Sequence, residues 1–466
     1  MPVLLWTDRL IFLLVALAVA IVLYVRRHEH LRAPWARVAR SSVAMSALVV
    51  LAFYVVIGLL DSMHYRALVT PARDGAPAEY STEISSVFDR LAAPLRAGTE
   101  KTYSAPFATH LYAKETVDTP LGQQRVYPRL EHGGAHLGDP PRGKAHDIAL
   151  TVLGASARAL VVWLVVLGAT AALWGRRHGV TPARAAATLL GGRTPVRWRA
   201  MLVTLGVGLM LAFSVAALGV DYHVLGTDKV GEDVLYQALK SVRTGLVIGT
   251  LTTLVMLPFA VALGIMAGYF RGFVDDVIQY FYTTLNSIPS VLLIVAFVLM
   301  LQVYLDNHAD RYSSVVERAD LRLLFLCMIL GVTSWTGLCR YLRAETLKLR
   351  EIDFVQAASA LGVGHFSILS RHVLPNVMHL VLITVVLDFS GLVLAEAVLS
   401  YVQIGVDPTM HSWGNMINSA RLEMAREPVV WWSLAAAFVF MFTLVLAANL
   451  LSDVVRDAFD PRLRGA

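Results

Sequence analysis

Few residues of this 466-residue chain have the type and spacing that nucleotide binding requires. The segment 138–144 reads GDPPRGK, which matches the G-x-x-x-x-G-K spacing of a phosphate-binding loop. Ala145 follows it, in place of the serine or threonine whose hydroxyl would bind the metal ion, and two prolines interrupt the turn. We therefore expect no nucleotide site in this chain.

The candidate metal ligands are equally weak. His28–His30 reads His-Glu-His among arginines and lacks the H-E-x-x-H spacing, and His132 and His136 lie in a glycine-rich loop. Cys327 and Cys339 are twelve residues apart in one predicted helix, hence about 18 Å apart, which is too far for a disulfide. No Ser/His/Asp set has a spacing that indicates catalysis. We expect neither a metal site nor an enzyme.

The composition is that of a membrane protein. Hydrophobic residues make up 56% of the chain and charged residues 16%, whereas soluble domains are about a quarter charged. The net charge of +6 is modest, and the basic residues cluster beside apolar segments. This placement favours membrane topology over nucleic-acid binding, so the expected surroundings are a lipid bilayer.

The apolar segments predict about nine membrane-spanning helices, because a span needs about 20 mostly apolar residues. They are residues 10–25, 43–60, 148–174, 200–220, 242–269, 277–304, 321–342, 377–404 and 429–450. When the spans alternate, every arginine cluster falls on one side, which the positive-inside rule assigns to the cytoplasm. The polar segment 61–147 is then an external loop or small domain. Pro258 and Pro289 lie within spans and predict plain kinks.

The segment 353–376 lies on the cytoplasmic side between two spans and has an unusual pattern. Its apolar residues recur at i, i+3, i+4 and i+7, which predicts a short helix with one apolar face made of Phe354, Ala357, Ala358 and Leu361. Gly362 is expected to end this helix, because glycine readily adopts a positive φ. Pro375 suits the first turn of the next helix, where no backbone donor is needed.

This segment resembles the cytoplasmic EAA loop of binding-protein-dependent ABC importer permeases, whose pattern is E-A-A, three residues, G, nine residues, I-x-L-P. Gln356 stands in place of the family glutamate and His372 in place of the isoleucine. In that family the helix docks into a groove of the ATPase subunit. The resemblance therefore implies that coupling to an ATPase rests on Phe354, Gln356, Ala357, Ala358, Leu361, Gly362, Leu374 and Pro375. The alternative is a helix that packs only on its own protein.

Further motifs extend the resemblance in order along roughly half of the chain. The family patterns LGTD-x-x-GRDV, AGYFGG, aFPS, AEASLSF and PSWG are matched by residues 225–234, 267–272, 286–290, 395–401 and 412–414. Glu232 replaces an arginine of the first pattern. The chain is thus similar to the second, C-type, permease subunit of dipeptide and oligopeptide importers.

Three polar residues are candidates for the translocation pathway: Asp388, Glu396 and Asn286. A charge at the middle of the bilayer costs roughly 2.5–3.5 kcal/mol on insertion scales, so such residues usually face the interior of a helix bundle. The alternative for each carboxylate is a polar contact between helices, or a position already at the membrane interface.

The resemblance implies an all-α membrane protein with a type I ABC importer permease-like helical bundle and extra N-terminal transmembrane helices. Residues 1–199 would form an N-terminal extension or insertion with about three of these helices. Residues 200–466 would form the permease domain. Either residues 35–60 or residues 200–220 correspond to the first span of the family, and the sequence leaves this choice open.

The implied function is that of the permease subunit of an ATP-driven importer for peptides or similar small solutes in the bacterial inner membrane. No cofactor is expected in this chain, because ATP and Mg would be bound by partner subunits. The implied partners are a homologous permease subunit forming a heterodimer, two ABC ATPase subunits and an extracytoplasmic substrate-binding protein. Two alternatives stay open: a self-contained secondary transporter or channel that uses Asp388 and Glu396, and a membrane scaffold whose residues 61–147 bind an external partner.

Overall fold

The computed structural model of the chain describes residues 1–70, 79–119, 122–138, 140–308 and 314–459. The chain divides into two compact units that interleave along the sequence. The first unit contains residues 1–3, 30–244 and 411–451, and the second contains residues 4–29, 245–410 and 452–466. The predicted domain boundary between residues 199 and 200 lies inside the first unit and does not coincide with any of its ends. It stays a prediction.

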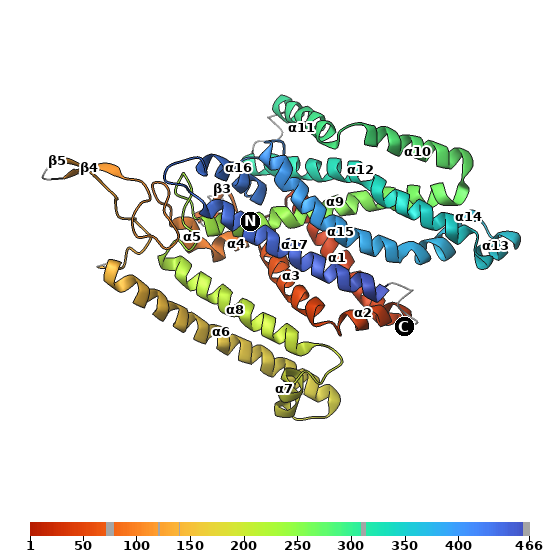
Figure 1. The fold of residues 1–466 in the computed structure, drawn as a ribbon, viewed down its shortest axis with the longest axis horizontal. Helices are drawn as coiled ribbons and strands as arrows, with labels where there is room; N and C mark the ends of the chain where they lie inside the picture. The colour runs from red at the N-terminus through yellow and green to blue at the C-terminus, as the bar shows by residue number, and fades with distance from the viewer. Residues whose placement is uncertain (71–78, 120–121, 139, 309–313, 460–466) are drawn as a thin grey trace. The chain divides into compact units, whose positions relative to one another are not determined.

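Nine helices in the described part of the chain are long and apolar enough to cross a membrane, which confirms the predicted all-α bundle (Figure 1). They are α1 (Trp6–Arg27), α3 (Ser42–Asp61), α6 (Pro140–His178), α8 (Trp198–Asp221), α9 (Val234–Phe270), α11 (Ser290–Asn307), α12 (Val315–Arg350), the helical run that ends in α15 (Leu374–Tyr401), and α17 (Trp432–Phe459). The shorter helices are α2 (Glu29–Val38), α4 (Val87–Leu91), α5 (Ala93–Ala97), α7 (Pro182–Leu190), α10 (Gly272–Ser287), α13 (Asp353–Ala360), α14 (His365–Ile368) and α16 (Trp413–Glu423).

The segment 61–147, which is predicted to be external and which we call the external domain, belongs to the first unit and contains strands. Strand β2 (His64–Thr70) pairs antiparallel with β1 (Pro2–Val3) and β3 (Glu79–Ser86), in a register that places Tyr65 opposite Ser85. Strands β4 (Glu115–Thr119) and β5 (Gly122–Val126) form a separate hairpin. In this polar segment, runs that favour extended backbone alternate with residues that favour turns. This pattern is typical of strands, whereas most of the other described elements are helices.

Helices α6 and α8 form an antiparallel hairpin in the first unit. Leu167 packs near Leu202 at one end, and Ile148 packs near Leu218 at the other. The indole Nε1 of Trp163 donates a hydrogen bond to the carbonyl of Leu202 at 2.8 Å. Helix α7 closes the hairpin, because its amphipathic sequence buries Ala185 and Leu189 against both longer helices.

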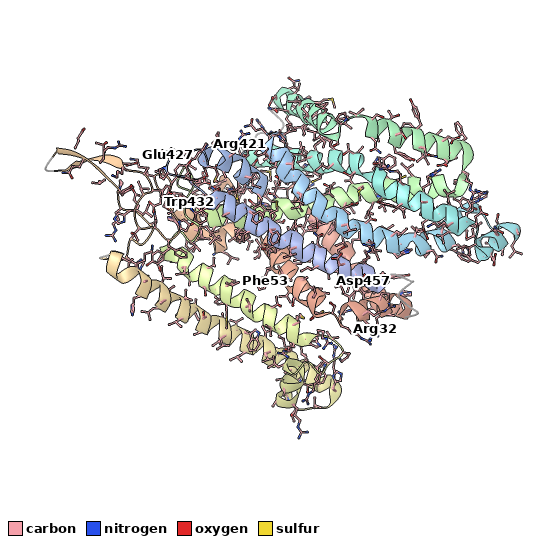
Figure 2. All side chains as sticks on the ribbon, in the orientation of Figure 1. Arg32, Phe53, Arg421, Glu427, Trp432 and Asp457 are labelled. Carbon is pink, nitrogen blue, oxygen red and sulfur yellow. The ribbon has the colours of Figure 1, made fainter. Side chains whose placement is uncertain are left out.

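Aromatic side chains brace the external domain against the first residues of α17. Trp432, labelled in Figure 2, is almost fully buried, and its Nε1 donates to the carbonyl of Thr227 at 2.9 Å. Tyr112 packs edge-on against this indole with ring centroids 4.9 Å apart. The residues of the predicted LGTD motif are therefore held between the external domain and α17.

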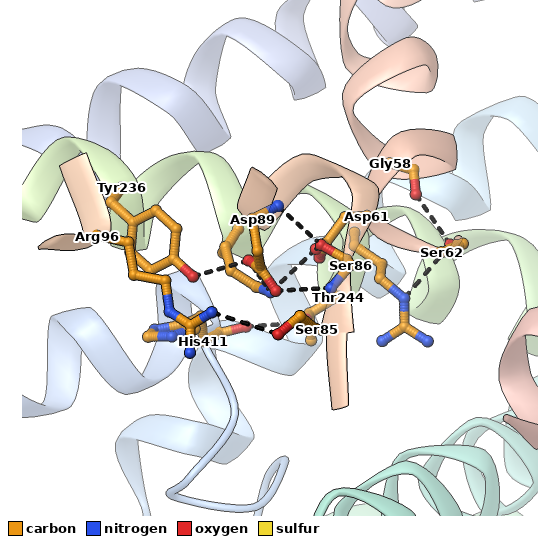
Figure 3. A network of polar contacts seen from close by, with 12 residues as sticks. Gly58, Asp61, Ser62, Ser85, Ser86, Asp89, Arg96, Tyr236, Thr244 and His411 are labelled. Atoms are coloured by element: carbon orange, nitrogen blue, oxygen red, sulfur yellow. Dashed lines mark hydrogen bonds and ion pairs between the residues drawn. The ribbon is translucent and has the colours of Figure 1, made fainter. Parts of the chain in front are cut away.

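A buried polar network joins the external domain to the first turns of α9 (Figure 3). Lys240 pairs with Asp61 at 3.0 Å and with Asp89 at 2.6 Å, and the Ser86 hydroxyl donates to Asp61 at 2.7 Å. The Tyr236 hydroxyl donates to Asp89 at 2.8 Å. Burial opposes ionisation of Asp89, but the charge and hydrogen bond of Lys240 outweigh it and lower the pKa of this carboxyl to about 2.

A second buried cluster centres on His223. Its Nδ1 lies 2.8 Å from the Asp233 carboxylate and its Nε2 lies 3.4 Å from that of Glu100. Glu100 also accepts hydrogen bonds from three consecutive backbone N–H groups, those of residues 131–133, at 2.8–3.0 Å. Burial opposes both charges, yet these hydrogen bonds raise the pKa of His223 to about 9 and lower that of Glu100 to about 2.

In the second unit, α10 and α11 together run antiparallel to α12. Leu301 and Leu305 of α11 pack near Leu321 at one end of α12. Near the other end, Arg343 of α12 makes two hydrogen bonds of 2.6 Å with the carboxylate of Asp275 in α10. Such a bidentate pair fixes both the distance and the orientation of the two helices.

The predicted span 277–304 with a plain kink at Pro289 is wrong in one respect, because the helix is broken there. Helix α10 ends at Ser287, Ile288 is extended at φ −90° and ψ 127°, and α11 begins at Ser290. The proline ring disfavours the helical conformation of the preceding residue, and proline offers no N–H to continue the ladder. Pro258, in contrast, lies inside the continuous helix α9.

Helix α1 belongs to the second unit and packs near the N-terminus of α12. The backbone N–H of Thr7 donates to the Asp320 carboxylate at 3.1 Å, and the Thr7 hydroxyl bonds to the same carboxylate. Most of the side chains of α1 beyond this contact are exposed. This helix is therefore anchored at one end and presents an apolar surface suited to lipid.

The His223 cluster makes the stability of the external domain depend on pH. Because the folded pKa of Glu100 lies below its ordinary 4.5, its contribution is lost as pH falls from 4.5 toward 2. Because the folded pKa of His223 lies above its ordinary 6.5, its contribution is lost as pH rises from 6.5 through 9. Thermal unfolding of the purified chain should be most resistant between these two windows.

Replacing His223 with glutamine should lower the free energy of unfolding by about 3 kcal/mol, because it leaves two buried carboxylates without a cation. Thermal unfolding and amide exchange at residues 131–133 measure this loss. His146→Gln, at an exposed position of the same unit, is the matched control. Equal stability of the two variants would contradict the assignment.

Candidate functional site

Helix α13 is fastened to the rest of the second unit by two small apolar side chains. Val355 is 2% exposed and Ala358 is 8% exposed. Both belong to an apolar cluster that includes Leu349 of α12, Ile368 of α14 and Tyr269 of α9. The helix has only eight residues, too few to be stable in isolation, so this packing is what maintains it.

The opposite side of α13 presents large apolar side chains to solvent. Phe354 is 42% exposed and Leu361 is 84% exposed, and Ala357 is exposed as well. Ala358, the third residue of the predicted apolar face, packs inward. The reason is the helical period: at about 100° per residue, Ala358 lies about 40° from Phe354 and about 60° from the buried Val355. It therefore sits at the edge where the exposed stripe meets the core.

The sequence prediction missed Phe366, which is 83% exposed in the short helix α14. An aromatic residue directly after the glycine-rich turn was the available signal. Large apolar residues exposed at a loop usually mark an interaction surface. Phe366 adds a third such side chain to those of Phe354 and Leu361.

Gly362 ends α13 in a conformation that other residues rarely adopt. Its φ is +76°, its N–H donates to the carbonyl of Ser359, and the N–H of Val363 donates to that of Ala358. These two bonds define a Schellman motif, in which the residue after the cap is left-handed. No heavy atom beyond its chain neighbours lies within 4 Å of a Cβ placed at Gly362. The demand for glycine is therefore conformational and not steric.

The segment predicted as a loop up to residue 376 is helical from His365 onward. A π-turn over Leu369–Val373 joins α14 to α15, which begins at Leu374 and carries Pro375 in its first turn. Proline lacks the N–H that an uninterrupted α-helix would need there, and a π-turn is a common local adjustment. The second half of the segment is therefore a continuation of the membrane helix.

Polar contacts link the ends of α9 and α12 to α14. The Tyr269 hydroxyl lies 2.9 Å from Nδ1 of His365, and Arg350 donates to the Tyr269 carbonyl at 2.6 Å. Arg271 forms an ion pair with Glu351. Together with residues of α13, the side chains of Tyr269, Arg350, Glu351 and His365 line a cavity of about 510 Å³.

Arg271 occupies a strained position in this arrangement. Its φ is +57°, and it stands where the family pattern AGYFGG has a glycine. A non-glycine residue in this region costs of order 1–3 kcal/mol, and the ion pair with Glu351 offsets part of that cost. Glu351 also accepts a hydrogen bond from the amide of Gln356 through its carbonyl, at 3.3 Å. Gln356 therefore points toward α12, in the position where the family pattern has glutamate.

Asn286 lies at the end of α10, beside the helix break. Its side-chain oxygen accepts a hydrogen bond from the Thr336 hydroxyl at 3.2 Å. It lines a cavity of about 200 Å³ together with Pro289, Ser290 and Thr333. Exposed polar residues also occupy the neighbouring turn of α10, namely Thr283, Thr284 and Ser287.

The two candidate carboxylates of α15 occupy different environments. Glu396 is 1% exposed and accepts a hydrogen bond from the Ser400 hydroxyl at 2.8 Å. Asp388 is half-buried. The two are separated by about two turns, or about 12 Å along the helix axis, so they do not form a carboxylate pair.

In the LGTD motif, the side-chain amide of Gln237 stabilises the glutamate that replaces the family arginine. The amide of Gln237 donates to Asp228 at 2.9 Å and to Glu232 at 3.1 Å. Burial, and the nearby charge of Asp228, raise the pKa of Glu232 above its ordinary value. The neutral amide of Gln237 thus bridges Asp228 and Glu232, whereas the family pattern has an aspartate and an arginine at these two positions.

The weaker motifs give no site in the described residues. His136 bonds to Asp147 at 3.0 Å, whereas His132 lies 4.0 Å from Glu100. No group of three or more His, Cys, Asp or Glu side chains suited to a metal occurs among the residues that the structure describes. His28–His30 and the 138–144 pattern fall partly outside the described side chains.

The sequence of this chain matches known membrane transport proteins. Residues 260–465 match the family described as "Binding-protein-dependent transport system inner membrane component". The chain is 30% identical over 244 residues to a glutathione transport system permease protein of Pectobacterium atrosepticum, covering 52% of this chain and 73% of the relative. It is 30% identical over 243 residues to an oligopeptide transport system permease protein of Haemophilus influenzae, covering 52% and 71%.

An oligopeptide transport system permease protein of Mycobacterium tuberculosis is 31% identical over 244 residues, which cover 52% of this chain and 77% of that relative. These likenesses reach across most of each relative, and the nine candidate spans fit an inner-membrane component. The chain therefore belongs to the binding-protein-dependent transport system inner membrane components, as a multi-pass permease subunit of an ABC importer that is not itself an enzyme.

Proposed function

We propose that this permease subunit moves peptides or similar small solutes inward, and that α13 couples it to separate ATPase subunits. The names of its relatives, which are oligopeptide and glutathione permease proteins, support this class of cargo. The observation that carries the coupling proposal is the two-sided burial of α13. Val355 and Ala358 fix the helix to its own chain, while Phe354 and Leu361 stay exposed for a partner.

The exposed face is suited to dock into an apolar groove of an ATPase. Fully burying a Phe or Leu side chain contributes about 1.5–3 kcal/mol, so two or three such anchors hold a short helix firmly. ATP and Mg are bound by the partner subunits in this scheme, because this chain supplies no nucleotide motif. Gln356, Ala357, Leu374 and Pro375 belong to the same coupling segment.

Force applied to α13 would reach the membrane helices through its buried side. Val355 and Ala358 share one apolar cluster with Leu349 of α12 and with Val373, which directly precedes α15. Gly362 supplies the pivot between α13 and α14. A displacement of α13 would therefore move the cytoplasmic ends of α12 and α15 together.

The solute pathway is proposed to run along the exposed polar side of α10. Asn286, Thr283 and Ser287 are exposed in this chain alone, and such polar side chains are poorly suited to lipid. A homologous permease subunit, forming a heterodimer, would cover this side and complete the pathway. Asp388 and Glu396 are proposed as further polar groups near it.

The remaining assembly follows the family. Two ABC ATPase subunits and an extracytoplasmic substrate-binding protein would complete the importer. Residues 1–199 would be an extension to a permease domain over residues 200–466, since the family match begins only at residue 260.

Replacing Gly362 with valine should reduce solute uptake about tenfold or more without loss of membrane insertion. A β-branched residue at φ +76° costs more than about 1–2 kcal/mol, so the Schellman turn would open. Uptake of labelled peptide and the amount of protein in the membrane fraction measure the two effects. Gly364→Val is the matched control, because Gly364 has a φ of −61° and open space around it. Equal uptake by both variants would argue against a pivot at Gly362.

Replacing Leu361 with aspartate should abolish most ATPase copurification, because a charge would enter the docking groove. We expect at least roughly a tenfold loss, from about 1.5–3 kcal/mol of lost burial together with the desolvation of the new charge. Leu422→Asp on α16, also an exposed leucine, is the control and should retain the ATPases. Retention of the ATPases by the Leu361 variant would refute docking through this face.

Replacing Asn286 with leucine should raise the KM for uptake roughly fivefold while ATPase copurification is unchanged. The change removes one hydrogen-bonding group, worth about 1 kcal/mol, from the proposed pathway. Measurement of KM and of maximal uptake in proteoliposomes separates a pathway role from a folding defect. An unchanged KM would exclude Asn286 from the pathway.

A further inference from the structure

The connection between α6 and α8 carries an unusual concentration of arginines. Residues 175–199 contain no acidic residue, and six exposed arginines lie there: Arg176, Arg177, Arg184, Arg193, Arg197 and Arg199. The positive-inside rule accounts for cationic residues at this end of the helices. It does not require that they be brought next to other cations.

Folding nevertheless brings a second cationic segment to this connection. The backbone N–H of Arg197 donates to the carbonyl of Ala39 at 3.0 Å, and its guanidinium donates to the carbonyl of Arg40 at 3.2 Å. Arg37 in the last turn of α2 and Arg40, two residues beyond its end, therefore lie in the segment that approaches the arginines before α8. Arg32 of α2, labelled in Figure 2, adds to the charge of this helix.

The resulting cluster, which we call the arginine cluster, comprises Arg37, Arg40, Arg193, Arg197 and Arg199. No ion pair joins these five side chains to a carboxylate in the part of the chain that the structure describes. Like charges gathered in one region repel, and an anion placed among them would relieve the repulsion. Guanidinium groups match the geometry of phosphate oxygens, which they bind in a bidentate manner.

An apolar stripe begins directly at this cluster. Along α8, Arg199 is followed at intervals of four residues by Val203, Val207 and Leu211, all of which are exposed. Residues spaced by four lie on the same side of a helix. The helix rises about 18 Å from Arg199 to Leu211, and the apolar residues from Val203 to Leu211 cover about 12 Å of this, which is close to the roughly 15 Å depth of one leaflet of the hydrocarbon core.

Tryptophans occur in the same three helices that lead into the arginine-rich segments. Trp198 begins α8, and Trp174 near the end of α6 stacks on His178 with ring centroids 4.0 Å apart. Trp35 of α2 is 41% exposed. Tryptophan is enriched where headgroups meet acyl chains, so this pattern favours a lipid over a soluble anion or an acidic protein.

We propose that the arginine cluster binds the headgroup phosphate of an anionic phospholipid of the inner leaflet, whose acyl chain lies along Val203, Val207 and Leu211 of α8. The phosphate neutralises the cluster, and the acyl chain covers the exposed stripe. The lipid would thereby hold α2 and the α6–α8 hairpin together at the cytoplasmic surface.

Binding of defined lipids to the full chain, purified in neutral detergent, tests this proposal. Native mass spectrometry would count long-chain phosphatidylglycerol and phosphatidylcholine retained by the protein. Wild-type protein should retain phosphatidylglycerol in preference to phosphatidylcholine. Arg40→Gln/Arg199→Gln should weaken that preference roughly 25-fold, because each of the two basic residues contributes a factor of about five near a membrane surface.

Arg90→Gln/Arg125→Gln, which removes two exposed arginines of the external domain, is the matched control and should behave as wild type. Glycerol phosphate added in excess to the lipid-loaded protein should not displace phosphatidylglycerol, because it lacks the acyl chain. Equal retention of both lipids, equal loss in the control, or full competition by glycerol phosphate would each overturn the proposal. Loss of copurified ATPase from the Arg40/Arg199 variant with unchanged lipid retention would also overturn it, because the face would then bind protein.

Discussion

The segment proposed to couple this chain to ATPases depends on how burial is divided across one short helix. Val355 and Ala358 must be buried for eight residues to remain helical, and their burial leaves Phe354 and Leu361 without cover. A helix buried on all sides could not receive a partner, and one without the inner contacts would not hold its shape. The left-handed Gly362 allows both the buried and the exposed side to persist. Its Schellman turn ends the helix directly after Leu361, so the exposed side chains are not covered by a continuation of the helix.

Around this helix, the second unit is held by polar contacts between helix ends, and regular helix is interrupted at several positions. The ion pair between Arg343 and Asp275 fixes α10 against α12. Arg271 has a strained, positive φ and forms an ion pair with Glu351. The break at Pro289 frees the end of α10, where Asn286 lines a small cavity. Broken helices inside a membrane protein are tolerated where polar groups line a cavity or pack on protein, so the break and the polar residues beside it belong together.

The first unit is organised by charge. In and beside the segment predicted to be external, carboxylates and cations are paired and buried: Lys240 with Asp61 and Asp89, and His223 with Glu100 and Asp233. At the opposite end of the α6–α8 hairpin the arginines are exposed and have no described acidic partner. One physical rule explains both the buried pairs and the exposed arginines. A cation without a protein carboxylate must be solvated or bind another anion, and the membrane surface offers phosphate.

The sequence by itself determined the membrane class, the number of spans and the family, because apolar length and ordered motifs are local properties of the chain. It also determined that Gly362 ends a helix. Only the tertiary structure decided that Ala358 packs inward, that Phe366 is exposed and that the helix resumes at His365. It alone revealed the break at Pro289 and the approach of Arg197 to Arg40. Periodicity gives the angle between residues on a helix, but the side that becomes buried depends on which neighbours pack there, and those neighbours are distant in sequence.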